Sequence, residues 1–259
     1  MKLEGAVWTF VAREGVGPPI LWSLGRRYNA ARRARTTMPF GPRGIYKLVP
    51  RLSWQADEQV SKVLERVAPG ARIVDLGAGG RKITPGTICL DFIRQENTDV
   101  IGDVQRLPFQ DASIDLVYAT GIFEHVLDER AVIAEMHRVL RIGGFVHVEV
   151  PFLEQYHEDP IDCRRLTVQG LELSMAAAGF TTVKKGAHIG PTVTLLNTFA
   201  RWTALWLEAD NVVCKAASFA CYAFLATVLY PFKFLDWILI RKQNAHRLAM
   251  GVYYTGRRT

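Results

Sequence analysis

Short apolar runs alternate with amphipathic stretches through the middle of the chain. Apolar runs between turn residues are typical of buried strands, and apolar positions three and four residues apart are typical of helices. The predicted strands are residues 72–76, 87–91, 100–101, 114–119, 145–150, 181–184 and 250–255. The predicted helices are residues 56–67, 129–140 and 168–178. This alternation indicates βαβ units around a mostly parallel sheet.

Two flanking regions depart from this pattern. Residues 1–55 contain an arginine-rich stretch followed by prolines and glycines, which predicts a basic helical arm and a turn-rich linker. Residues 189–249 are rich in aromatic and aliphatic side chains. We therefore expect a basic extension (1–55), an α/β core (56–188), an apolar helical insertion (189–249) and a final strand of the core sheet (250–259).

Composition narrows the class of protein. A hydrophobic content of 49% with 22% charged residues indicates a globular protein and argues against disorder. The net charge of +7 favours an acidic partner, such as a phosphate-bearing substrate, an anionic membrane surface or nucleic acid. Nucleic acid is disfavoured because the arginines lack an aromatic stacking platform. The four cysteines form no C-x-x-C pair and no cluster with histidine, so we expect reduced thiols and no metal site.

The most informative motif is I-V-D-L-G-A-G-G at residues 73–80. An apolar run containing Asp75 leads into a turn with Gly77 and Gly79. This pattern predicts a buried strand, then a turn whose backbone approaches a ligand, then a helix whose amide groups point at the same place. Alone, the motif indicates a nucleotide-type site and no particular cofactor.

Acidic residues at the ends of the next two strands define the ligand further. Asp91 ends the second strand, where a carboxylate accepts hydrogen bonds from both ribose hydroxyls. Asp103 follows the third strand and is placed to accept from an adenine amine, with Val104 against the ring. A dinucleotide turn requires a third small residue, but Lys82 stands at that position. The pattern therefore favours an adenosyl cofactor without phosphate over a dehydrogenase cofactor.

With these residues in place, the sequence resembles the class I S-adenosylmethionine (SAM)-dependent methyltransferases, and in particular the group called methyltransferase type 11. The resemblance covers about residues 56–188. The segments that carry it are Asp75-Leu76-Gly77-Ala78-Gly79, Asp91, Gly102-Asp103-Val104, Leu107-Pro108-Phe109, Asp115-Leu116-Val117, Glu124-His125-Val126 and Arg138-Val139-Leu140-Arg141-Ile142-Gly143-Gly144.

The resemblance implies a three-layer Rossmann-like α/β fold with a seven-stranded sheet whose last strand is antiparallel. It places the apolar helical insertion between strands six and seven. It also implies SAM as the cofactor. The implied cofactor-binding residues are Asp75, Gly77, Ala78, Gly79, Asp91, Phe92, Asp103, Val104 and Thr120.

Two histidines are candidates for the catalytic base. His125 follows the fourth strand, and the alternative is that Glu124 and His125 only shape the pocket. His157 lies in a segment similar to a pattern, H-x-x-P-x-D-Y-W-R-F-T, of type 11 enzymes linked to glycan or cell-envelope pathways. We favour His157 because imidazole accepts a proton near neutral pH. Asp162 and Arg165 join His157 as candidate substrate-binding residues, or else form a structural ion pair.

That segment also departs from the pattern. The matching positions are His157, Pro160, Asp162, Arg165 and Thr167, and the departing positions are Cys163, Arg164 and Leu166. Because the departures fall where the pattern has aromatic residues, we expect the side chains that line the substrate site to differ from those of the pattern. Surface or packing roles are expected for the remaining histidines, which are His137, His147, His188 and His246.

The apolar insertion raises the question of a membrane. Residues 216–232 are 17 positions without a charge, the lower edge of a transmembrane helix. A single crossing would separate the final strand from its sheet, so we expect the insertion to lie on the membrane or dip into it. Lys215, Lys233, Arg241 and Lys242 suit anionic headgroups. The alternatives are a dimer interface and a lid over the sheet.

Together these features predict a SAM-dependent methyltransferase, peripheral at the cytosolic face of a membrane, that methylates a hydroxyl of a saccharide, a lipid or a lipid-linked acceptor. Its expected partners are that acceptor, an anionic membrane surface and a second copy of the chain. The alternative is a methyltransferase-like protein that binds SAM without catalysis and acts as a membrane-associated or dimeric interaction module.

Overall fold

The computed structural model describes residues 8–9, 56–79, 82–157 and 161–259. The basic arm predicted for residues 1–55 therefore lies outside the described residues, apart from a two-residue strand. Pro160 of the substrate-loop pattern also lies outside them.

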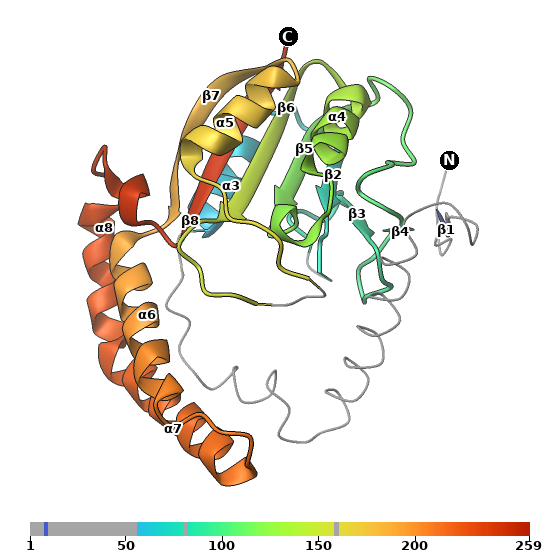
Figure 1. Ribbon diagram of the computed structural model, residues 1–259. Helices are drawn as coiled ribbons and strands as arrows, with labels where there is room; N and C mark the ends of the chain where they lie inside the picture. The colour runs from blue at the N-terminus through green and yellow to red at the C-terminus, as the bar shows by residue number, and fades with distance from the viewer. Residues whose placement is uncertain (1–7, 10–55, 80–81, 158–160) are drawn as a thin grey trace.

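One mixed β-sheet forms the centre of the molecule (Figure 1). Its strands are β1 (Trp8–Thr9), β2 (Ile73–Leu76), β3 (Ile88–Asp91), β4 (Val100–Ile101), β5 (Ile114–Thr120), β6 (Leu140–Pro151), β7 (Phe180–Ile189) and β8 (Gly251–Arg258). Their order is β1-β4-β3-β2-β5-β6-β8-β7, and only β8 runs antiparallel, to both β6 and β7. The seven-stranded arrangement is confirmed, and β1 extends it at the β4 edge in a way that the sequence did not predict.

Helices cover both faces of this sheet, as the three-layer prediction requires. Helices α4 (Glu129–Val139) and α5 (Val168–Ala177) pack on one face, where Val74 and Val117 join the main core. On the other face, helix α3 (Ala56–Leu64) contributes Val63, which packs with residues of β2 and β5. Because β2 is covered on both faces, all four of its residues are buried, which explains the continuous apolar run in the sequence.

Two local predictions were wrong. No helix follows the glycine turn: the described residues between β2 and β3 form turns and bends, because Pro85 and Gly86 interrupt a connection too short for a helix. The paired glycines Gly143 and Gly144 also predict a C-terminal cap for the helix over residues 129–140, but α4 ends at Val139 and both glycines lie inside β6. A Cβ atom on Gly144 would lie 2.9 Å from the Arg141 carbonyl oxygen, so close backbone packing requires glycine there.

The predicted helical insertion lies between β7 and β8. It comprises α6 (Pro191–Leu205), α7 (Val212–Leu229), η2 (Tyr230–Leu235), α8 (Asp236–Leu239) and η3 (Ala245–Leu248). Helices α6 and α7 lie side by side and extend away from the sheet, and we call this pair the α6–α7 hairpin (Figure 1).

A buried carboxylate fixes the base of the hairpin. Asp236 is fully buried and accepts hydrogen bonds from the backbone N–H groups of Thr192 (2.8 Å) and Val193 (3.0 Å), in the first turn of α6. Gly190 is required beside it, because a Cβ atom there would lie 2.3 Å from the Asp236 carboxyl carbon. Lys233 was predicted to bind headgroups, but it is only 4% exposed and its Nζ lies 3.8 Å from the Tyr230 ring centroid. That prediction was wrong for Lys233.

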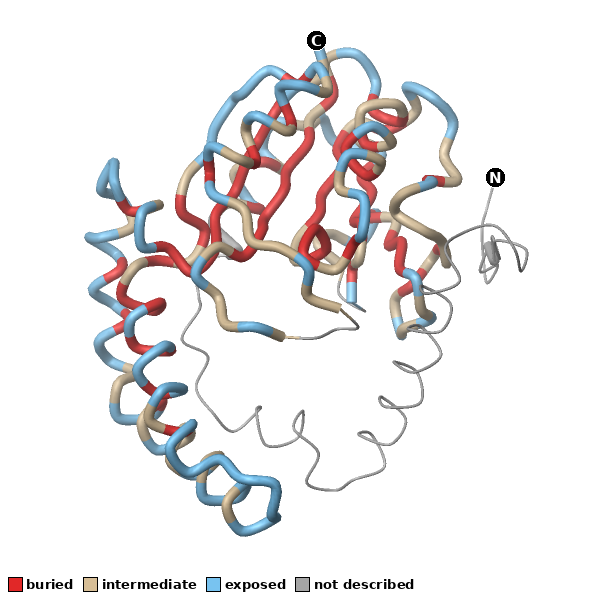
Figure 2. Tube along the Cα trace, in the orientation of Figure 1, coloured by how far each residue is buried: buried red, intermediate tan, exposed pale blue. Residues whose placement is uncertain are grey.

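The outer surface of the hairpin is exposed and apolar (Figure 2). Its exposed large side chains include Leu195, Phe199, Trp202, Leu205, Trp206, Val212, Val213, Phe224 and Val228. By length and composition, one helical segment of the described chain, Val212–Leu239, could cross a membrane, and only 6% of its most apolar stretch is buried. Monomeric soluble proteins rarely expose so large an apolar surface, so a partner surface is expected here.

Candidate functional site

The glycine turn lies where β2 ends. Gly77 and Gly79 have φ angles of 71° and 61°, in the left-handed region that side chains disfavour. A Cβ atom on Gly77 would lie 2.1 Å from Cγ2 of Ile122, whereas one on Gly79 would meet nothing closer than 3.9 Å. The two glycines therefore have different roles, since Gly77 permits close packing and Gly79 leaves open space beside the turn.

Asp91 connects this turn to the end of β3. Its carboxylate accepts hydrogen bonds from the backbone N–H of Gly79 (3.1 Å), the backbone N–H of Ile93 (3.0 Å) and Nε2 of Gln95 (3.2 Å). A carboxylate has about four acceptor positions, so Asp91 retains capacity for a ribose hydroxyl, and the Gln95 side chain is a displaceable donor. Phe92, the next residue, is 45% exposed and offers a ring surface.

The remaining predicted cofactor residues lie around the same edge of the sheet. Asp103 is half-buried after β4 and accepts from the backbone N–H of Gln105 (2.8 Å), while Val104 packs against the core. Asp75 and Ala78 are buried. Burial, and then the charge of Asp75, raise the pKa of Cys89 to about 11. An open glycine turn flanked by two carboxylates fits an uncharged ribose and adenine, and we call this group the cofactor edge.

Lys82 has a structural partner. Its ammonium group forms an ion pair with Asp99 at 2.8 Å and donates to the Thr87 carbonyl oxygen at 3.3 Å. These contacts tie the loop after β2 to the segment that precedes β4. The lysine therefore braces the cofactor edge in place of the third glycine of a dinucleotide turn.

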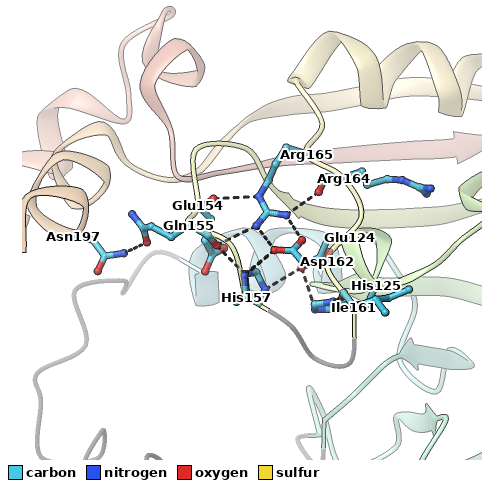
Figure 3. Close-up of polar contacts among 10 residues, drawn as sticks. All are labelled: Glu124, His125, Glu154, Gln155, His157, Ile161, Asp162, Arg164, Arg165 and Asn197. Atoms are coloured by element: carbon cyan, nitrogen blue, oxygen red, sulfur yellow. Dashed lines mark hydrogen bonds and ion pairs between the residues drawn. The ribbon is translucent and has the colours of Figure 1, made fainter. Parts of the chain in front are cut away.

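A second group of polar residues lies beyond β5 (Figure 3), and we call it the acceptor edge. The short helix η1 (Phe123–His125) carries Glu124, which is 3% exposed, next to His125. His157 approaches from a separate loop, and its ring meets the His125 ring edge-to-face with centroids 5.3 Å apart. Both candidate bases are thus brought together. Burial raises the pKa of the Glu124 carboxyl, and the two histidines oppose that rise.

The hydrogen bonds of the two histidines fix their tautomers. Nδ1 of His125 lies 2.5 Å from the Ile161 carbonyl oxygen, and Nδ1 of His157 lies 3.1 Å from the Gln155 carbonyl oxygen. A carbonyl oxygen only accepts, so each Nδ1 carries the proton and each Nε2 presents a lone pair in the neutral ring. Both Nε2 atoms face Oε1 of Glu124, at 3.7 Å for His125 and 3.8 Å for His157.

Asp162 and Arg165 brace the His157 loop. The guanidinium pairs with both carboxylate oxygens, 2.6 Å from Nη2 to Oδ2, and it also donates to the carbonyl oxygens of Glu154 (3.1 Å) and Gln155 (3.0 Å). Asp162 accepts from the His157 backbone N–H at 2.8 Å. The hydrogen bonds of Arg165 hold the pKa of Asp162 at about 2. The structural ion pair is therefore present, while a substrate contact for either residue stays a prediction.

A buried polar network behind the site was missed by the sequence analysis. Glu149 accepts from the hydroxyls of Tyr118 (3.1 Å) and Thr120 (2.9 Å) and pairs with His147 (3.1 Å) and His188 (3.2 Å). Burial would raise its pKa, but the two histidines and the hydroxyl donors hold it below the ordinary value. The alternation of His147 and Glu149 along one strand was the available signal, because such residues share a face.

The hydroxyl of Thr120, predicted to contact the cofactor, is thus directed into this network. His147 and His188 do have packing roles, as expected by default, but as partners of a buried carboxylate.

The acceptor edge is joined to the α6–α7 hairpin (Figure 3). Nδ2 of Asn197 donates to Oε1 of Gln155 at 2.8 Å, and Gln155 also donates to the Thr198 hydroxyl at 3.1 Å. From the other helix, the Tyr222 hydroxyl donates to Oδ1 of Asn197 at 3.1 Å. Because the Gln155 carbonyl oxygen accepts from His157, one residue connects the hairpin to the candidate base.

Sequence comparisons agree with this geometry. Residues 75–148 match a family described as a methyltransferase domain. The malonyl-[acyl-carrier protein] O-methyltransferase of Serratia marcescens is 29% identical over 97 residues, covering 30% of this chain and 37% of that protein. The demethylmenaquinone methyltransferase of Mycobacterium sp. (strain KMS) is 38% identical over 93 residues, covering 30% and 40%. The matches span well under half of either relative.

The fold recurs among solved structures. The crystal structure of the [4+2]-cyclase SpnF superposes with a TM-score of 0.50 at 19% identity, covering 80% of this chain and 82% of that one. At this level of identity, the likeness shows a shared fold. The similarity to methyltransferase domains covers residues 75–148, which include the glycine turn, Asp91 and Asp103, and SAM is the cofactor that it supports.

Proposed function

We propose that this protein transfers a methyl group from SAM to a hydroxyl of a saccharide, lipid or lipid-linked acceptor held at the cytosolic face of a membrane. The observation that carries the proposal is the hydrogen-bonded connection from the exposed apolar hairpin through Gln155 to His157. An acceptor that is anchored near the hairpin would reach the acceptor edge and the cofactor edge at once.

The chemistry rests mainly on positioning. SAM supplies an electrophilic methyl group on a sulfonium and leaves as a neutral thioether. Nε2 of His157 accepts the proton of the acceptor hydroxyl while the new oxygen–methyl bond forms and the sulfur–methyl bond breaks. The imidazolium then returns its proton to solvent, which reaches this side chain because it is 38% exposed. Asp162 and Arg165 hold the loop, and so the ring, in place.

The membrane part of the proposal rests on the surface of the hairpin. Tryptophan and phenylalanine side chains such as Trp202, Trp206 and Phe224 suit the boundary between headgroups and acyl chains. The tip between the helices carries the exposed acids Glu208 and Asp210. Acids in the hydrocarbon region are costly, so the hairpin is expected to lie along the interface and not to enter tip first.

Calorimetry and methyl transfer test the enzyme proposal together. Wild-type protein should bind SAM and transfer a labelled methyl group to a component of membrane or cell-envelope extracts. SAM binding without transfer to any fraction would favour the non-catalytic interaction module. Absence of SAM binding would overturn both proposals.

Flotation with anionic liposomes tests the membrane proposal. Wild-type protein should float, and a variant with Trp202→Ala and Trp206→Ala should remain at the bottom of the gradient. Leu173→Ala is the matched control, because Leu173 is 71% exposed on α5, away from the hairpin. A wild-type protein that does not float but forms a stable dimer would assign the hairpin to a subunit interface instead.

A further inference from the structure

The acceptor edge contains three potential metal ligands from two separate segments. A carboxylate oxygen of Glu124 and a ring nitrogen from each of His125 and His157 all lie within 4.8 Å of one another (Figure 3). No sequence pattern predicts a metal here, because His157 lies on a different loop from the other two residues. Only the fold brings the third ligand to the first two.

The histidines are oriented as metal ligands usually are. A ligating histidine binds through one ring nitrogen and donates the other N–H to a carbonyl or carboxylate, which fixes its orientation. Here the Nδ1–H groups of His125 and His157 donate to the carbonyl oxygens of Ile161 and Gln155, and both Nε2 lone pairs face Glu124. The segment between β6 and α5 thus supplies the same kind of outer contact to both histidines.

Glu124 provides an independent observation. Its side chain is 3% exposed, and its Oε2 atom has no hydrogen-bond partner among the described residues. A buried polar atom without a partner is costly, and a buried carboxylate more so. A cation bound by the Glu124 carboxylate would satisfy that oxygen, whereas the neutral Nε2 atoms, which lie near Oε1, have no proton to donate.

We propose that Glu124, His125 and His157 bind one divalent transition-metal ion of the kind that prefers mixed nitrogen and oxygen ligands, such as Zn²⁺, Fe²⁺ or Co²⁺. Two imidazoles and one carboxylate suit these ions and do not suit Mg²⁺ or Ca²⁺. Metal–ligand bonds of about 2.0–2.2 Å would require the ligand atoms to move together. At present the Nε2 atoms of His125 and His157 lie 3.7 and 3.8 Å from Oε1 of Glu124. Side-chain rotation and a small movement of the His157 loop accomplish this.

The role of the ion, unlike its binding, rests on the proposed function. Three protein ligands leave positions open for the acceptor oxygen, and coordination lowers the pKa of a bound hydroxyl. The hydroxyl proton would then pass to solvent, because a ligating Nε2 has no lone pair left to accept it. The metal form and the metal-free form should therefore differ in the pH dependence of methyl transfer.

Titration of chelator-treated protein with Zn²⁺ by calorimetry, and with Co²⁺ by visible absorption, tests binding without any acceptor. Wild-type protein should bind one equivalent. His157→Ala and Glu124→Gln should each weaken binding by at least about 100-fold, beyond the roughly 10- to 100-fold effect of outer contacts. His246→Ala is the matched control and should bind as wild type. Circular dichroism and SAM affinity verify that each variant is folded.

Several outcomes would overturn the proposal. They are the absence of stoichiometric binding, equal binding by the His157→Ala variant, and a thiolate-to-Co²⁺ charge-transfer band, which would place the ion on cysteine. If a metal-free protein still transfers methyl groups and binds no ion, the metal proposal fails while the proposed function stands. If the ion binds but no acceptor is methylated, the proposed function fails alone.

Discussion

The two edges of the site are built in different ways. The cofactor edge comes from residues 75–104, and its contacts join neighbouring strand ends, such as Gly79 to Asp91. The acceptor edge combines η1, the His157 loop and both helices of the hairpin, with partners as distant as Asn197 and Gln155. A site for a shared cofactor is local and regular, whereas a site for a particular acceptor is assembled from the variable parts of the fold.

The largest effect should come from removing the candidate base. We expect His157→Ala to lower kcat by about 10²- to 10⁴-fold, the usual contribution of general base catalysis, with an unchanged Kd for SAM. Steady-state kinetics and calorimetry measure the two quantities. His246→Ala serves as the control. If the His157→Ala variant also lost SAM affinity, the cofactor edge would depend on the acceptor edge.

The cofactor edge is probed by Asp91→Ala. Losing two charge-assisted hydrogen bonds to the ribose should weaken SAM binding on the order of 100-fold. Gln95→Ala is the control, because it removes only a side chain that donates to Asp91. Calorimetry gives both affinities. Unchanged binding by the Asp91→Ala variant would remove Asp91 from the cofactor site.

The brace of the acceptor edge should make stability depend on pH. The pKa of Asp162 lies at about 2 in the folded protein, below the ordinary 3.8, so its ion pair stabilises the fold above pH 4 and loses that contribution as the pH falls towards 2. Asp162→Asn should therefore lower the free energy of unfolding by about 2 kcal/mol at pH 7.

Denaturant unfolding at pH 7 and at pH 2.5 measures this difference between wild type and variant. The difference in the free energy of unfolding between wild type and Asp162→Asn should be smaller at pH 2.5 than at pH 7. If this difference in unfolding free energy is the same at pH 7 and pH 2.5, the carboxylate charge contributes nothing to the stability of the loop.

The smallest effect tests the connection between the hairpin and the acceptor edge. Asn197→Ala removes the hydrogen bond to Gln155, worth about 1 kcal/mol, as well as the bond accepted from Tyr222 within the hairpin. Loss of the Gln155 bond should raise KM for a membrane-held acceptor about fivefold without changing SAM affinity. Thr203→Ala, which loses hydrogen bonds to the Phe199 and Ala200 carbonyl oxygens within α6, is the control. An equal KM in both variants would indicate that the hairpin does not position the acceptor.

The sequence was sufficient to predict the fold because the patterns that specify it are local or periodic. Buried strands give apolar runs, and glycines and acids at strand ends keep a fixed order, so the sheet and the cofactor edge were predictable from residues such as Gly77 and Asp91. The helix expected after the glycine turn was wrong because Pro85 and Gly86 interrupt the short connection to β3. The alternation of His147 and Glu149 was visible but has no meaning until a partner such as His188 is placed.

The acceptor edge was only partly predictable. His125 and His157 were identified separately, but their shared orientation toward Glu124 depends on two backbone carbonyl groups that no sequence pattern displays. Lys233 was misjudged for the same reason, because its burial depends on the packing of η2 against α6, α7 and α8.

The position of β8 has a consequence for how the chain is made. This strand lies between β6 and β7, yet the ribosome produces it after the whole hairpin, and its register pairs Pro151 with Gly251. Until β8 arrives, β6 and β7 each present an unpaired edge, which is a hazard for aggregation. The apolar hairpin emerges during that interval, so its exposed apolar surface is available to a partner before the sheet is complete.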